Sequence, residues 1–194
     1  MTIPVEQLLA ELEQITQQNI AFAQQARNYP PALLQARPAD GGWTILECLE
    51  HLNRYGNFYI PEINKRLLAS RHAPALLFKS GRIGNYFAGM MLPKARPNKM
   101  KTLKVMNPIH APLGPATLNN FLRQQQQLVD ILARCRTANL QKVRTAISIT
   151  PLLKLRLGDT LRVVVYHNLR HVKQAEKIIA KEAVSSPHPS AAGL

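Results

Sequence analysis

The apolar residues between Gly158 and Ala180 recur at the three- and four-residue spacing of one helix face. This apolar stripe contains Leu161, Val164, Val165, Leu169, Val172, Ala175, Ile178 and Ile179. The basic residues of the segment fall on the other side of the helical wheel. Because a helix with one apolar face has to bury that face, the segment predicts a helix that packs against other elements.

Three earlier segments show the same spacing, at residues 5–26, 45–67 and 117–135. No alternation of strand and helix patterns accompanies them, so nothing favours an α/β fold. The sequence therefore predicts an all-α, up-down four-helix bundle with a long basic connection between its second and third helices. We expect one domain over residues 1–184, followed by a flexible tail at 185–194.

The second helix has the clearest beginning in the chain. Thr44 and Glu47 match the Thr-x-x-Glu capping box, in which each side chain binds a free backbone N–H at the helix start. Trp43 precedes the cap, where an apolar residue can pack back onto the first turn. Further along, Pro61 cannot donate to the carbonyl of Asn57, which predicts a kink or a break.

The connection at residues 71–115 is rich in proline, glycine and lysine, yet it also carries large apolar residues. A connection of this length inside a compact domain is usually functional or disordered. Its apolar content favours a lid or crossover that packs on the bundle, with a short helix near Ile83–Met91. Between the third and fourth helices, an extended piece is expected at Ala146–Ile149.

The formal net charge is +14, and it is unevenly distributed. Residues 1–62 have a net charge of −4, whereas 63–129 contain eleven Lys or Arg and no acidic residue. Such an imbalance favours anionic partners, including a small anionic substrate, or simply aids solubility. The two cysteines do not form a disulfide framework, and no apolar run reaches the ~20 residues of a membrane span. We expect a cytoplasmic protein that does not insert into membranes.

Histidine is the residue type that points to chemistry, because phosphate-binding glycine loops and zinc-finger cysteine spacings are absent. His167 and His171 lie one helical turn apart, so their side chains can share a metal ion. A third ligand has to come from another helix, and His51 is the only other histidine within a predicted helix. Cys48 is a soft alternative ligand, although a core position suits it better. All three histidines can equally be core residues.

Two segments resemble the DinB-like superfamily of bacterial four-helix proteins, which includes YfiT-like and bacillithiol-transferase-like branches. They are RPADGGWTILECLEHL, at residues 37–52, and LGDTLRVVVYHNLRHVKQ, at residues 157–174. The family pattern is a Trp-Ser/Thr helix start with a later His-Leu, then His-x-x-x-His followed by Gln in the last helix. The matching positions here are Trp43, Thr44, Glu47, His51, Leu52, His167, Arg170, His171 and Gln174.

This resemblance implies a divalent metal ion, commonly zinc or nickel, bound by His51, His167 and His171. It also implies a metal-dependent transferase or hydrolase that acts on a small molecule, with an anionic compound or a low-molecular-weight thiol as candidate partners. No general base can be assigned. Tyr55, Tyr166 and Glu47 are candidates by position only, and structural roles suit them better.

Two other interpretations remain open from the sequence. The protein could instead bind nucleic acid, with phosphate contacts from a set of basic residues and base stacking from Tyr86 and Phe87. Those basic residues are Lys94, Arg96, Lys99, Lys101 and Lys104. It could also be a non-catalytic helical bundle, and a homodimer formed through helix faces is consistent with any of these functions.

Overall fold

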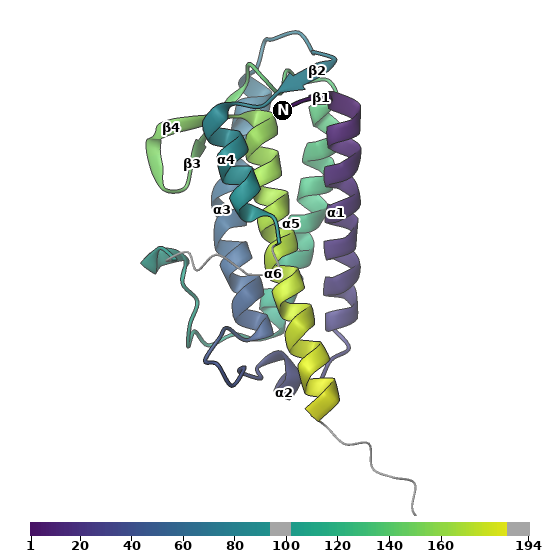
Figure 1. Ribbon diagram of the computed structural model, residues 1–194, viewed down its shortest axis with the longest axis vertical. Helices are drawn as coiled ribbons and strands as arrows, with labels where there is room; N and C mark the ends of the chain where they lie inside the picture. The colour runs from purple at the N-terminus through teal and green to yellow at the C-terminus, as the bar shows by residue number, and fades with distance from the viewer. Residues whose placement is uncertain (94–101, 186–194) are drawn as a thin grey trace, which may run out of the picture.

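Four long helices lie side by side in the computed structural model, which describes residues 1–93 and 102–185 (Figure 1). They are α1 (Val5–Ala26), α3 (Ile45–Ala69), α5 (Pro115–Cys135) and α6 (Leu157–Ser185). Helices α5 and α6 each pack against both α1 and α3. The predicted all-α four-helix bundle is confirmed.

The direction of the helices follows from which of their residues share a core. One apolar cluster joins Leu8 near the start of α1, Ile63 late in α3, Leu132 late in α5 and Leu161 early in α6. Helices α3 and α5 therefore run parallel to each other and antiparallel to α1 and α6 (Figure 1). Helices α1 and α3 are antiparallel, as are α5 and α6, in agreement with an up-down order. Between α3 and α5, the long connection carries the chain back along the bundle before α5 begins.

Helix α3 begins as the sequence predicts. The Thr44 side chain accepts from the Glu47 backbone, and the Glu47 carboxylate accepts from the Thr44 backbone. The helix continues through Pro61 without a break, contrary to one of the two predicted outcomes. Both Pro61 and Asn57 are exposed, so water can satisfy the carbonyl that proline leaves without a donor. A short helix, α2 (Pro31–Leu34), precedes α3.

The connection after α3 is a crossover packed on the bundle. Strand β2 (Leu77–Lys79) pairs antiparallel with β1 (Thr2–Pro4), and α4 (Arg82–Met91) then packs along α6. The predicted short helix is therefore present. A 3₁₀ turn, η1 (Lys104–Met106), then lies against α3. The expected tail and most of the expected phosphate-binding lysines lie outside the described residues.

A β-hairpin joins α5 to α6, where the sequence predicts an extended piece. Strands β3 (Arg144–Ile147) and β4 (Thr150–Arg156) are antiparallel, with an irregularity between Ala146 and Ile147. Together with α4, this hairpin covers one side of the bundle (Figure 1). No helix in the described part of the chain is long and apolar enough to cross a membrane.

A buried ionic network fastens α4 to the first turn of α6. The Asp159 carboxylate accepts from the Ser80 hydroxyl and, at 2.9 Å, from the Gly81 backbone. Arg162 donates to Ser80 Oγ and Asn85 Oδ1, each at 3.1 Å, and lies 3.5 Å from Asp159 Oδ1. We call Asp159, Arg162, Ser80 and Asn85 the closed charged cluster, because its charges are paired inside the protein.

Candidate metal centre

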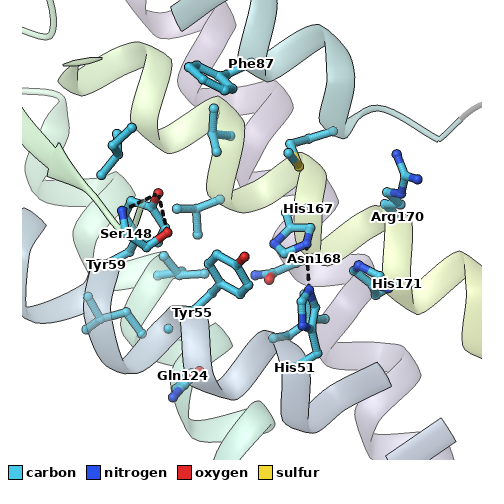
Figure 2. Close-up of a pocket in the computed structure, with 18 of the residues that line it drawn as sticks. His51, Tyr55, Tyr59, Phe87, Gln124, Ser148, His167, Asn168, Arg170 and His171 are labelled. Carbon is cyan, nitrogen blue, oxygen red and sulfur yellow. Dashed lines mark hydrogen bonds between the residues drawn. The ribbon is translucent and has the colours of Figure 1, made fainter. Parts of the chain in front are cut away.

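Three histidines from two helices converge in the middle of the bundle. His51 projects from α3, and His167 and His171 project from α6 (Figure 2). One nitrogen from each ring lies within 4.8 Å of the others, and the Nε2 atoms of His51 and His167 are 3.2 Å apart. The three ring centroids are separated by 4.7–5.0 Å. We call these residues the histidine cluster.

Oxygen atoms outside the cluster fix the orientation of two of the rings. His51 Nδ1 lies 2.7 Å from the Met106 carbonyl oxygen, and His171 Nδ1 lies 2.9 Å from Gln174 Oε1. Both oxygens are acceptors only, so each Nδ1 carries the hydrogen and donates it. In a neutral imidazole the lone pair is then on Nε2. The Met106 carbonyl of η1 and the Gln174 side chain of α6 therefore fix the directions of the Nε2 lone pairs of His51 and His171.

The environment keeps the imidazoles neutral. Burial lowers the pKa of His51 to about 4 and that of His171 to about 3. The charge of His51 lowers the pKa of His171 further. Burial, followed by the charges of His171 and His51, lowers the pKa of His167 well below its ordinary value. Since a metal binds the unprotonated imidazole, the cluster is in its ligand form at neutral pH.

Aromatic rings enclose the cluster on two sides. The Trp43 ring centroid lies 4.6 Å from that of His51 and 5.6 Å from that of His171. On the other side, Tyr55 meets His51 and His167 edge-on at 4.9 and 4.8 Å. The only tryptophan of the chain thus contacts two of the three histidines.

Glu47 holds the loops that surround this end of α3. Besides capping the helix, its carboxylate accepts from Arg37 and from the backbone of His110, each at 2.7 Å. Burial opposes ionisation of Glu47, but the bonds from Arg37, Thr44 and His110 outweigh it and lower the pKa. A carboxylate committed to these partners is a structural anchor, as its position in the capping box predicts.

A layer of buried amides, which we call the polar layer, crosses the bundle beside the histidine cluster. It separates the two apolar clusters of the bundle. Gln125 Oε1 accepts from Asn19 of α1 and Asn168 of α6, at 3.4 and 3.3 Å. The layer comprises Asn19, Asn53, Gln124, Gln125 and Asn168. Sequence reasoning gave the glutamines no role, although Gln125 falls on the apolar face of its helix. That polar residue in an apolar stripe is the feature that could have revealed the polar layer.

The other candidate residues are separate from the cluster. Burial raises the pKa of the Cys48 thiol, which therefore stays protonated in the core. The Tyr166 hydroxyl donates to Glu11 at 2.6 Å, away from the histidines. His72 and His110 are exposed and take no part in the cluster. Of the tyrosines named from the sequence, only Tyr55 contacts it.

Two hollows meet at the histidine cluster. The inner cavity, of about 230 Å³, is bounded by α3, α4, α5, α6 and the β3–β4 hairpin (Figure 2). The outer groove, of about 700 Å³, lies along α6 and is lined by Lys173, Lys177 and Lys181. Arg170 and His171 line both. Phe87, a candidate for base stacking, faces the inner cavity instead.

Comparison with known proteins agrees with this architecture. A solved structure of YfiT from Bacillus subtilis, described as a probable metal-dependent hydrolase with an unusual four-helix bundle topology, matches with a TM-score of 0.54 and 16% identity. The match covers 90% of this chain and 87% of YfiT. A search of the curated proteins found no match. The family model of the DinB superfamily matches residues 14–175, and the chain therefore belongs to the DinB superfamily.

Proposed function

We propose that the protein is a divalent-metal-dependent enzyme that acts on a small molecule and binds its ion through His51, His167 and His171. The observation that supports this proposal most strongly is the fixed orientation of two rings. Met106 and Gln174 accept hydrogen bonds from Nδ1 of His51 and His171, which leaves the Nε2 lone pair of each ring available, and His51 Nε2 lies 3.2 Å from His167 Nε2. Metal-binding histidines characteristically have this outer hydrogen bond.

The donor set fits a zinc or nickel ion. Both metals accept imidazole nitrogen, and catalytic zinc sites commonly use three protein ligands with one further position for water or substrate. A divalent ion held here would supply a Lewis acid that can lower the pKa of a water molecule or a thiol.

Hydrolysis is the first candidate reaction, and two features of the chain support it. Tyr55 lies edge-on to His51 and His167 and would adjoin a water molecule or substrate bound beside them. A divalent ion held by three histidines would leave a position at which a water molecule could be activated for attack.

Thiol transfer is the second candidate, and the outer groove supports it. Asp40 and Glu182 also line this groove, but together with Arg170 the three lysines outnumber them beside His171. An anionic low-molecular-weight thiol could bind there while the other reactant occupies the inner cavity. A cytoplasmic location, where such thiols and free Cys48 and Cys135 stay reduced, is part of this proposal.

Metal analysis of protein prepared without a histidine tag tests the proposal. We expect about one equivalent of zinc or nickel per chain, and less than about a tenth in His167→Ala. His72→Ala, which removes an exposed histidine outside the cluster, is the matched control and should retain the metal. Trp43 gives an independent optical readout, because its ring contacts two proposed ligands. Wild-type protein that neither retains nor takes up either metal would refute the proposal.

A further inference from the structure

The chemistry of the inner cavity indicates what kind of molecule it admits. Its walls are mainly apolar side chains from α4, α5, α6 and the hairpin, among them Phe87, Leu128, Ile147, Leu155 and Val163. Its volume of about 230 Å³ is below the ~300–1,000 Å³ of pockets that hold drug-sized ligands. The cavity therefore suits a small molecule that buries most of its apolar surface.

The described lining of the cavity provides almost no charge to balance an ionised ligand. No Asp, Glu or Lys is among the described residues that line it, and Arg170 is its one Lys or Arg. The Arg170 guanidinium already donates to the Met90 carbonyl at 3.0 Å, and the residue also lines the outer groove. Because an ion buried without a charged partner is strongly unfavourable, and Arg170 lies at the histidine end, the part of the ligand that lies away from the histidine cluster should be uncharged.

A pair of hydroxyl groups forms a hydrogen-bonding site in the cavity wall away from the histidines. Tyr59 Oη lies 3.4 Å from Ser148 Oγ and accepts from the Ser148 backbone N–H at 3.3 Å. Tyr55 lies between this pair and the histidine cluster, with its ring stacked 6.3 Å from that of Tyr59 (Figure 2). Each hydroxyl can donate one hydrogen bond and accept others, so the pair can bind a hydroxyl or carbonyl group.

We propose that the inner cavity binds an uncharged, mostly apolar small molecule with one hydroxyl or carbonyl group, which Tyr59 and Ser148 hydrogen-bond. The other end of the molecule then lies beside the histidine cluster. That placement of the reacting end rests on the proposed metal-dependent function, whereas binding in the cavity does not. Tyr59 and Ser148 are thus specificity-determining residues, and any anionic reactant binds in the outer groove.

Three probes of the same bicyclic shape test the charge and the polar group separately. Binding of 1-naphthol, naphthalene and 1-naphthoate to the full-length protein is measured by fluorescence titration at pH 7, with a chelator present so that no bound metal ion can ligate the carboxylate. We expect 1-naphthol to bind most tightly and 1-naphthoate to bind at least about tenfold more weakly. In Tyr59→Phe and Ser148→Ala, the affinity for 1-naphthol should fall about three- to tenfold, with that for naphthalene unchanged.

A pair of variants on the hairpin locates the binding site. Ile149→Trp places a large ring at the rim of the cavity and should abolish binding of 1-naphthol and naphthalene. Leu152→Trp, on the same hairpin but 93% exposed and outside the lining, should bind both like the wild type. Circular dichroism of each variant checks that it is folded.

Binding of 1-naphthoate as tightly as 1-naphthol would overturn the proposal, as would unaltered binding in folded Ile149→Trp. Zinc uptake is measured on the same preparations. Naphthol binding without zinc uptake would leave this inference standing and refute the proposed metal-dependent function. Zinc uptake with no binding of either neutral probe would refute this inference and leave the proposed metal-dependent function standing.

Discussion

Helix α6 carries two buried polar sites that differ in how their hydrogen-bonding capacity is used. In the closed charged cluster, donors meet acceptors, and Asp159 and Arg162 are paired with each other and with residues before or within α4. In the histidine cluster, by contrast, ring nitrogens converge on one another, and the Nε2 atoms of His51 and His167 lie 3.2 Å apart. The first arrangement pairs both charges within the protein and fastens α4 to the bundle, although the buried Arg162 Nε–H has no hydrogen-bond acceptor among the described residues. The second has the protein acceptors Met106 and Gln174 on its outer side and directs ring nitrogens toward one another on its inner side, as a ligand site requires.

Breaking the closed charged cluster should have the largest effect on stability. Asp159→Ala leaves the buried guanidinium of Arg162 without its carboxylate, so the free energy of unfolding should fall by about 3–5 kcal/mol. Asp130→Ala removes an exposed aspartate from α5 and should change the free energy of unfolding by no more than about 0.5 kcal/mol. Urea denaturation measures both. Equal losses in the two variants would show that the cluster has no special stabilising role.

The histidine cluster should make the metal-free protein sensitive to acid. An unfolded histidine binds its proton near pH 6.5, while burial lowers the pKa of folded His51 to about 4. The unfolded state therefore binds more protons between these values, and stability should fall as the pH falls. The loss attributable to His51 is on the order of 3 kcal/mol at ~1.36 kcal/mol per pH unit. In His51→Gln, the free energy of unfolding measured with urea should fall less steeply between pH 6.5 and 4 than in the wild type. An unchanged slope would contradict this.

The outer hydrogen bond to His171 should affect metal affinity more than stability. Gln174→Ala removes the acceptor at Nδ1, and the affinity for zinc should fall about 10–100-fold. The neighbouring Lys173→Ala alters an exposed side chain paired with Glu176 and should keep wild-type zinc affinity. Competition with a chromophoric chelator measures both. Equal zinc affinities for the two variants would exclude an orienting role for Gln174.

The smallest expected effect is the loss of one hydroxyl from the closed charged cluster. Ser80→Ala removes a donor to Asp159 and an acceptor for Arg162, while the carboxylate and guanidinium remain. The free energy of unfolding should fall by about 1 kcal/mol, and zinc affinity should not change. If zinc affinity changed as well, the two sites would be energetically coupled along α6.

The histidine cluster could be predicted from the sequence because its residues follow helical rules. The capping box at Thr44 fixes where α3 begins, and thus the face that His51 occupies; His167 and His171 are one turn apart. Met106 could not be identified, since it acts through its backbone carbonyl, which any residue has. The parallel course of α3 and α5 was also not predicted, because spacing within a helix says nothing about the direction in which a connection returns.

The polar layer also bears on how the helices are aligned along their length. Asn19, Gln125 and Asn168 come from three helices and share a single acceptor, Gln125 Oε1. If any one helix slid by a turn, its amide would enter an apolar cluster without a partner, and an apolar residue would face the remaining amides. Single buried asparagines fix helix register in this way in coiled coils. Asn53 ties α3 to the same layer, because its side-chain amide donates to the Thr117 carbonyl and its backbone carbonyl accepts from Gln124. The polar layer thus selects one helix register among several that would bury similar apolar area, and that register is the one in which α3 and α6 bring their histidines to the same level.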